Sequence, residues 1–251
     1  MWKCFEPEEA RWYHWNLNGA EVYLRREGDE WRTALRSVLF QEATPSADGP
    51  EPDRAPRNLP EYSAVGVGRQ VVLRPWFYEK PYCVNFRDRI RLMPETETRL
   101  DLALPPVLRL ELAGGLELTR FTPFLLPETW SGEDTMSGFL GVSLSVPSPP
   151  WSVTGASSFI HGEIIFRNQT KTILDIDRLV LYTDSLNVYK KEGDLRCETV
   201  VVDTNSNGEL RINPRPGTPD GYEAIPVARK NGMGNILIRR SADLIKNIAG
   251  R

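Results

Sequence analysis

The stretch of sequence that decides the fold is VLRLELAGGLELTRF, residues 107–121. Two runs in which apolar and polar residues alternate, 107–112 and 116–121, surround Ala113-Gly114-Gly115. Alternation with a period of two is typical of a strand with one buried face, and glycine between two such runs permits a tight turn. The stretch therefore predicts a β-hairpin. The side chains expected to face its core are Leu108, Leu110 and Leu112.

The same pattern recurs along the chain. Residues 21–25 and 31–36 flank Glu27-Gly28-Asp29 and predict a second hairpin. Further strands are expected at 69–74, 98–104, 139–146, 159–167, 173–182, 186–190, 195–202 and 208–213. Short strands at regular spacing, separated by turn residues, are typical of a β-sandwich or barrel. We therefore expect an all-β protein, an antiparallel β-sandwich of two packed sandwich-like halves, with a short C-terminal helix at about 241–249.

Two proline-rich segments suggest how the halves are organised. Pro147, Pro149 and Pro150 mark a boundary, so we expect one half over residues 1–148 and the other over 149–251. Residues 41–61 hold five prolines and five acids against two arginines. Such a composition buries too little apolar surface to order itself, which predicts a mobile acidic loop in the first half.

Composition excludes several classes of protein. The chain of 251 residues has 31 Lys and Arg against 34 Asp and Glu, a net charge of −3. Because nucleic-acid binding favours a strong basic field, we expect no nucleic-acid partner. No apolar run approaches the ~20 residues of a transmembrane helix. Acids occupy the place of a signal peptide's apolar core, so a cytoplasmic location is expected. The sparse cysteines, Cys4, Cys83 and Cys197, predict free thiols.

Catalytic signatures are scarce. The two histidines, His14 and His161, lie in expected strands, and no GxSxG or HExxH motif accompanies them. Asp175 and Asp177 share one face of a strand, but glycoside hydrolysis needs two carboxylates that converge across a cleft. We assign no catalytic residue, expect no cofactor, and favour a protein that is not an enzyme.

One segment has the opening of a calcium-binding loop. Residues 203–208, DTNSNG, fit D-x-[DN]-x-[DN]-G, but the twelfth position is Pro214 instead of a bidentate glutamate. The flanking residues also read as strands rather than helices. A hairpin turn is the favoured interpretation, and a weak calcium site formed by Asp203 and Glu209 is the alternative.

The segment FLLPETWSGEDTMSGFLG, residues 124–141, is the most individual part of the chain. It is expected to be a loop between two strong strands, and loops on rigid β scaffolds often carry binding groups. Trp130, Glu133 and Asp134 are the candidate ligand-binding residues, because tryptophan stacks on flat ligands and the two acids lie nearby. The favoured alternative is that Trp130 plugs the end of the sandwich.

Residues from about 81 to 203 resemble a family of archaeal and bacterial proteins known as domain of unknown function 432. The resemblance rests on the strands RLDLALPPVLRLEL, the loop Thr129-Trp130-Ser131-Gly132 followed by Gly138-Phe139-Leu140, and the later IIFRNQTKTILDIDRLVLY. The family usually has a larger aromatic residue where Ser131 stands. The resemblance implies no established activity, cofactor or catalytic residue.

Two functional hypotheses follow. The first is a non-enzymatic binding or interaction module with a protein partner. The alternative is a carbohydrate-binding or carbohydrate-active protein that uses Trp130 and the nearby carboxylates. The oligomeric state stays open.

Overall fold

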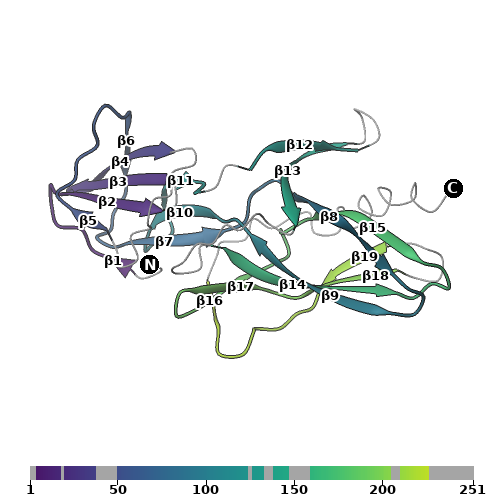
Figure 1. Ribbon diagram of the computed structural model, residues 1–251. Coiled ribbons are helices and arrows are strands. Elements are labelled where there is room, and N and C mark those ends of the chain that lie inside the picture. Colours follow the sequence, from purple (N-terminus) through teal and green to yellow (C-terminus); the bar gives the residue numbers. More distant parts are fainter. Residues whose placement is uncertain are drawn as a thin grey trace.

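The computed structural model describes residues 4–17, 20–37, 50–123, 126–132, 138–146, 159–204 and 210–225. Within these residues every regular element is a β-strand, and the strands form four sheets (Figure 1). The all-β class is therefore confirmed. The helix expected at 241–249 lies outside the described residues.

Two antiparallel sheets form the N-terminal sandwich. Sheet A has the order β1 (Cys4–Phe5), β7 (Val71–Trp76), β10 (Val107–Leu112) and β11 (Glu117–Phe121). Sheet B has the order β5 (Glu51–Pro52), β2 (Trp12–Leu17), β3 (Ala20–Glu27), β4 (Glu30–Ser37) and β6 (Glu61–Val65). Both hairpins predicted from the sequence are present, as the pairs β3–β4 and β10–β11. Phe5 of sheet A contacts the rings of Tyr13 and Trp15 edge-on, so the two sheets share a core.

Two further sheets form the C-terminal sandwich. Sheet C has the order β12 (Glu128–Ser131), β13 (Phe139–Val146), β8 (Tyr82–Leu92) and β15 (Leu174–Leu181). Sheet D contains β19 (Leu210–Pro214), β18 (Val200–Thr204), β14 (Ile160–Asn168), β17 (Asp194–Cys197), β16 (Val188–Lys191) and β20 (Glu223–Ala224), with β9 (Glu97–Leu104) on the other side of β14. The rings of Phe86 and Phe166 meet between the sheets, at a centroid distance of 6.0 Å.

Strand direction in the C-terminal sandwich departs from the antiparallel expectation. β13 runs parallel to β8, and β14 runs parallel to both β17 and β18. The single strand expected at 195–202 is two strands, β17 and β18, because the extended run is interrupted at the buried Glu198. The Glu198 carboxylate accepts hydrogen bonds from the backbone N–H of Asn187 at 2.6 Å and the Tyr189 hydroxyl at 2.9 Å. These hydrogen bonds satisfy the buried carboxylate, which thereby fixes the backbone between β17 and β18.

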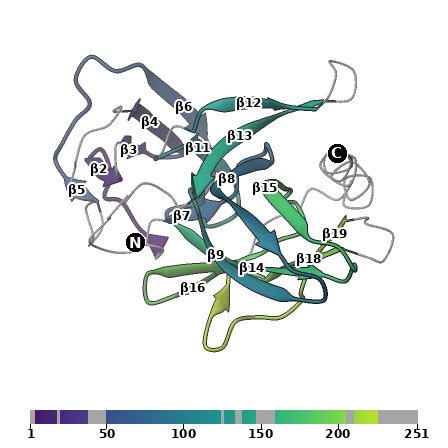
Figure 2. The same cartoon turned by 45° about the vertical axis from the view of Figure 1, so that its right-hand side comes forward.

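The division of the chain between the sandwiches does not follow the expected boundary at residue 148. β8 pairs with β15 and β9 pairs with β14, so strands from both sides of that position share sheets C and D. Between the described strands, the chain crosses from one sandwich to the other three times, from β7 to β8, from β9 to β10 and from β11 to β12 (Figure 2). One continuous cluster of buried apolar residues extends from Tyr13 to Ile225.

Part of the acidic segment 41–61 has a defined path. Residues 41–49 lie outside the described residues, but β5 pairs with β2. The Arg11 guanidinium donates to Asp53 with an Nε–Oδ1 distance of 2.7 Å. Pairing and this charged contact attach residues 50–53 to sheet B.

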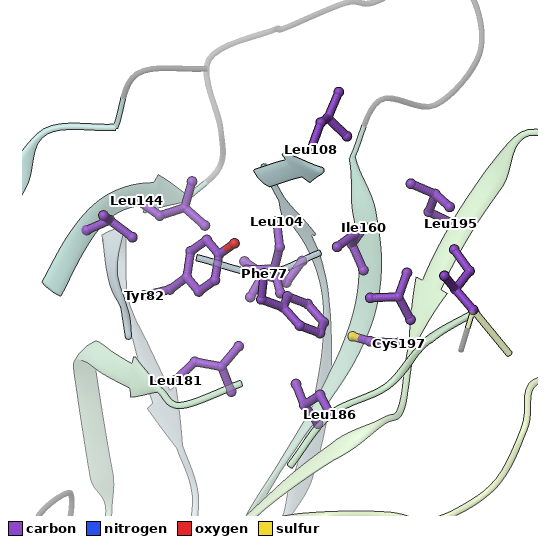
Figure 3. Packing of buried hydrophobic residues seen from close by; sticks show 14 of the residues in the cluster. Phe77, Tyr82, Leu104, Leu108, Leu144, Ile160, Leu181, Leu186, Leu195 and Cys197 are labelled. Carbon is purple, nitrogen blue, oxygen red and sulfur yellow. The ribbon is translucent and has the colours of Figure 1, made fainter. Parts of the chain in front are cut away.

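Two of the three crossings meet in a buried waist between the sandwiches. The Tyr82 hydroxyl, at the start of β8, donates to the carbonyl of Pro105, which follows β9, at 2.8 Å. It also accepts from the backbone N–H of Tyr78 at 3.3 Å. Figure 3 shows Phe77 and Tyr82 packed near Leu104 in the buried cluster. Burial raises the pKa of the Tyr82 hydroxyl, so the donor stays protonated.

Replacing Tyr82 with Phe tests the waist. The substitution keeps the ring but leaves the Pro105 carbonyl and the Tyr78 N–H without their partner, so the free energy of unfolding should fall by about 1–3 kcal/mol. A urea titration with an unchanged slope measures the loss. The control is Tyr62→Phe, because Tyr62 is exposed and should change stability by less than about 0.5 kcal/mol. Equal stability of the Tyr82→Phe variant and the wild type would contradict a structural role for this bond.

Candidate functional site

The segment expected as a binding loop, 124–141, contains one β-strand and the start of another. Strand β12 pairs antiparallel with β13, with Trp130 opposite Leu140 and Ser131 opposite Phe139. β13 pairs with β8 only from Val142 onward. Residues 139–141, with the part of β12 that pairs with them, thus extend past the start of β8 (Figures 1 and 2). The expectation of a loop is wrong for residues 128–131, which form β12. A strand of four residues is too short for an alternation of apolar and polar residues to be recognised in the sequence.

The core-facing side of this hairpin continues beyond the core. Alternate residues of β13 lie on one face, and along that face Leu144 and Val142 are 4% and 3% exposed whereas Leu140 is 41% exposed. Trp130 lies opposite Leu140 in the register and is 48% exposed. Leu140 and Trp130 therefore form an exposed apolar pair that continues the buried row of β13. We call Trp130 and Leu140 the overhanging pair.

Trp130 is not a core plug, and that favoured expectation is wrong. Its indole rests against Gly138, where an added Cβ would lie 2.3–2.5 Å from Cζ2, Cε2 and Nε1 of the ring. Real Cβ atoms do not approach so closely, so only glycine at position 138 leaves this room for the indole. The tryptophan is held on the hairpin itself and not between the sheets.

The opposite side of the hairpin attaches it to the sandwich. The Phe139 ring contacts that of Tyr182 at a centroid distance of 5.6 Å. An added Cβ at Gly141 would lie 2.5 Å from Sγ of Cys83, so β13 and β8 approach closely here. Lys80 forms an ion pair with Glu128 at the start of β12. These contacts place the overhanging pair on a supported strand pair.

The two buried thiols, Cys83 beside the hairpin and Cys197 in sheet D, are poorly suited to nucleophilic chemistry. Burial raises the pKa of Cys83, although the Ser131 hydroxyl opposes the effect, and burial raises the pKa of Cys197 to about 12. A thiol is nucleophilic as the thiolate, so both groups are protonated near neutral pH. All three cysteines are free thiols, and Cys4 is exposed.

The structure describes only some of the other predicted site residues. Glu133 and Asp134 lie outside the described residues, as does Glu209. Asp203 is on β18, with its Oδ1 3.9 Å from the Arg167 guanidinium. In the part of the chain that the structure describes, no group of three or more His, Cys, Asp or Glu side chains is arranged to hold a metal ion.

The carboxylates considered for glycoside hydrolysis are paired with arginines. Asp175 accepts from Arg91 at 2.8 and 3.2 Å, and Asp177 lies 3.9 Å from Arg89. The Arg91 bond lowers the pKa of Asp175. Asp175 is therefore held in the ionised form, whereas a general acid needs a raised pKa.

His14 is a buried histidine without a hydrogen bond to either ring nitrogen among the described residues. Its Nε2 lies 3.6 Å from Glu21, and its Nδ1 lies 3.6 Å from Glu51 of β5. The Tyr23 ring packs against the imidazole of His14 at a centroid distance of 4.7 Å. Burial is the main cause that lowers the pKa of His14, and the nearby Arg54 lowers it further, although the carboxylates of Glu21 and Glu51 oppose the shift.

Sequence reasoning missed Leu140 as part of the site. The signal for Leu140 was present, because the alternation of FLGVSLSV places Leu140, Val142 and Leu144 on one face. What the alternation does not show is where the neighbouring strand begins. The neighbouring strand β8 begins opposite Val142, and this position decides which of the three side chains is covered.

The fold and this surface define an all-β protein with two linked sandwiches and an overhanging hairpin. In a comparison with known families, residues 1–245 match the family described as Protein of unknown function (DUF432), and the chain belongs to it. Comparisons with curated proteins and with solved structures find no match. Among the described residues, no helix has the length and apolar character needed to cross a membrane.

Trp130→Ala should change the free energy of unfolding by less than about 1 kcal/mol, because the indole is half-exposed and leaves no cavity in the core. Trp31→Ala is the matched control. Trp31 is fully buried, and its removal should cost about 3–5 kcal/mol. Urea titrations of both variants measure the difference. A loss of several kcal/mol for Trp130→Ala would restore the plug interpretation.

Acid should destabilise the protein through His14. Its pKa in the folded state is lowered, whereas the unfolded chain takes up the proton near pH 6.5. The stabilisation from neutral His14 is thus complete above about pH 6.5 and is lost as the pH falls below that value. Urea titrations at pH 7.5, 6.5 and 5.5 measure the slope. His14→Gln should flatten it, and an unchanged slope in that variant would rule out this contribution.

Proposed function

We propose that the protein is a non-enzymatic binding module whose partner is another protein that docks on the overhanging pair. The observation that carries the proposal is the apolar row of β13, which is covered at Leu144 and Val142 and open at Leu140 beside Trp130. Tryptophan is enriched at the energetic centres of protein interfaces, and a neighbouring aliphatic residue completes an apolar anchor.

The open edge of β12 gives the partner a second means of attachment. Among the described residues, β12 is the terminal strand of sheet C and pairs with β13 on one side only. A terminal strand offers backbone N–H and C=O groups to an added strand, while exposed side chains beside it supply specificity. We therefore favour a partner that presents an extended apolar segment.

Three features support a role without catalysis. The two buried thiols have raised pKa values, Asp175 is paired with Arg91, and His14 is enclosed between Glu21 and Glu51. The protonated thiols, the arginine-paired carboxylate and the enclosed histidine have structural roles in the fold, and none of them is placed for acid–base or nucleophilic catalysis. A cytoplasmic location remains part of this proposal.

The second candidate is the binding or processing of a carbohydrate. The half-exposed indole of Trp130 favours it, because aromatic rings stack on sugar faces. The carboxylates of this candidate, Glu133 and Asp134, follow Trp130 in the sequence.

Interface variants test the protein-partner proposal. Tagged wild-type protein and its Leu140→Ser variant are used to capture proteins from an extract of the source cells, and each protein retained only by the wild type is purified for calorimetry. Trp130→Ala and Leu140→Ser should each weaken its binding by at least about tenfold, or ~1.4 kcal/mol. Ile173→Ser is the control, because Ile173, which immediately precedes β15, is exposed to a similar extent. Equal binding by Leu140→Ser and the wild type would contradict the proposed surface.

A panel of defined oligosaccharides separates the two candidates. If the function is carbohydrate recognition, Trp130→Ala abolishes binding to a sugar of the panel while Leu140→Ser retains it, since stacking needs the aromatic ring. Loss of protein binding in both variants, with no sugar bound by the wild type, favours the interaction module.

A further inference from the structure

The connection from β5 to β6 crosses the outer face of sheet B, from one edge of the sheet to the other. β5 pairs with β2 at the first edge, and β6 pairs with β4 at the second. Between these edges Arg54 lies 3.1 Å from Glu21 of β3, and Arg36 of β4 donates to the carbonyl of Arg57 at 3.3 Å. In Figure 2 the connection runs on the side of sheet B that is turned away from sheet A. We call residues 51–60 the strap.

Polar and charged contacts, rather than apolar packing, hold the strap on the sheet. The N–H of Asp53 donates to the carbonyl of Trp12 at 2.9 Å, and its carboxylate accepts from Arg11. Eight of the ten strap residues are exposed, and the other two are only partly buried. Asp53 and Asn58 have φ angles of 63° and 55°, so the chain turns at two points that bound the crossing. A segment with so little buried apolar surface opens at a lower free energy than the core.

The strap begins beside a buried histidine on the outer face of the sheet. His14 alternates along β2 with Tyr13 and Trp15, whose rings contact Phe5 of sheet A, so His14 points to the opposite side. Its side chain is nevertheless fully buried, and Glu51 of the strap lies directly opposite it in the register. The ring is therefore enclosed where the strap attaches to β2.

The charges around His14 balance only while its ring is neutral. The groups that face this cluster are two carboxylates, two guanidiniums and a phenol: Glu51 and Arg54 of the strap, Glu21 and Tyr23 of β3, and Arg36 of β4. The two acids and the two arginines cancel. A proton on the enclosed ring adds one net positive charge, and a buried charge without a balancing partner is costly.

We propose that the strap is an acid-sensitive switch, which closes over neutral His14 and opens when the ring takes up a proton. Opening gives the imidazolium access to water and frees the edge of β2 that β5 occupies. In the open state the histidine titrates near its ordinary value of about 6.5. Because one proton is taken up, the ratio of open to closed strap should rise about three- to tenfold between pH 7.5 and pH 5.5.

Hydrogen exchange at the Asp53 amide measures the opening, because its bond to the Trp12 carbonyl exists only in the closed strap. Exchange rates of the full chain at both pH values are measured by NMR and expressed as protection factors, which removes the intrinsic effect of pH. Protection of Asp53 should lie well below that of the buried Val22 on β3 and should fall about three- to tenfold at pH 5.5. Equal protection of Asp53 and Val22 would mean that the strap opens only with the whole sandwich. That result, or Asp53 protection that is the same at both pH values, would overturn the proposal.

Three variants test the role of charge balance. His14→Gln should show no fall in protection, because glutamine takes up no proton. Arg36→Gln leaves one acid without its partner, so a proton on His14 restores neutrality and the fall should shrink to less than about twofold. Arg32→Gln is the matched control, since Arg32 lies on the same face of β4 but pairs with Glu27 and Glu30, and it should keep the full effect. A fall that persists in His14→Gln, or equal behaviour of the two arginine variants, would overturn the switch. The strap is remote from the overhanging pair, so the result is independent of the proposed function.

Discussion

The hydrogen bond from the Tyr82 hydroxyl to the Pro105 carbonyl is the constraint on which the architecture depends. It joins the entry to β8 with the exit from β9, two of the three places where the chain passes between the sandwiches. With Phe77 packed beside it, the bond is fully buried, and each group would be left unsatisfied without the other. The waist therefore fixes where sheet C begins, which in turn decides how far β13 extends past its neighbour.

Local patterns predicted the strands well and their neighbours poorly. The hairpins around Gly28 and Gly114 follow from alternation and turn residues that lie within one short stretch of sequence. The pairings of β14 with β9, β17 and β18 join residues far apart in the chain, and alternation carries no information on strand direction. β8 was missed because RDRIRL, residues 87–92, places charges on most positions, and its register with β15 shifts beside Asp177. Trp130 was identified as a candidate, but its exposure depends on the length of β8, which its own segment does not encode.

In the proposed function, the overhanging pair offers an aromatic anchor beside the edge of β12 and suits a partner with a complementary apolar segment. Because the two sandwiches share one continuous core, a partner bound there would contact a rigidly supported strand pair.

The repeated passage of the chain between the sandwiches also governs the order in which the protein is assembled during synthesis. Sheet A is completed by β11, so the N-terminal sandwich has all its strands once Phe121 has left the ribosome. β8 and β9 have emerged by then, but β9 ends at Leu104 and its partner β14 begins only at Ile160. Two long strands therefore wait with unpaired edges beside a finished sandwich, at the stage when nascent chains are most prone to wrong pairing. The charges along β8 at Arg87, Asp88 and Arg89 oppose such wrong pairing, because charged side chains on an unpaired strand disfavour contact with another strand.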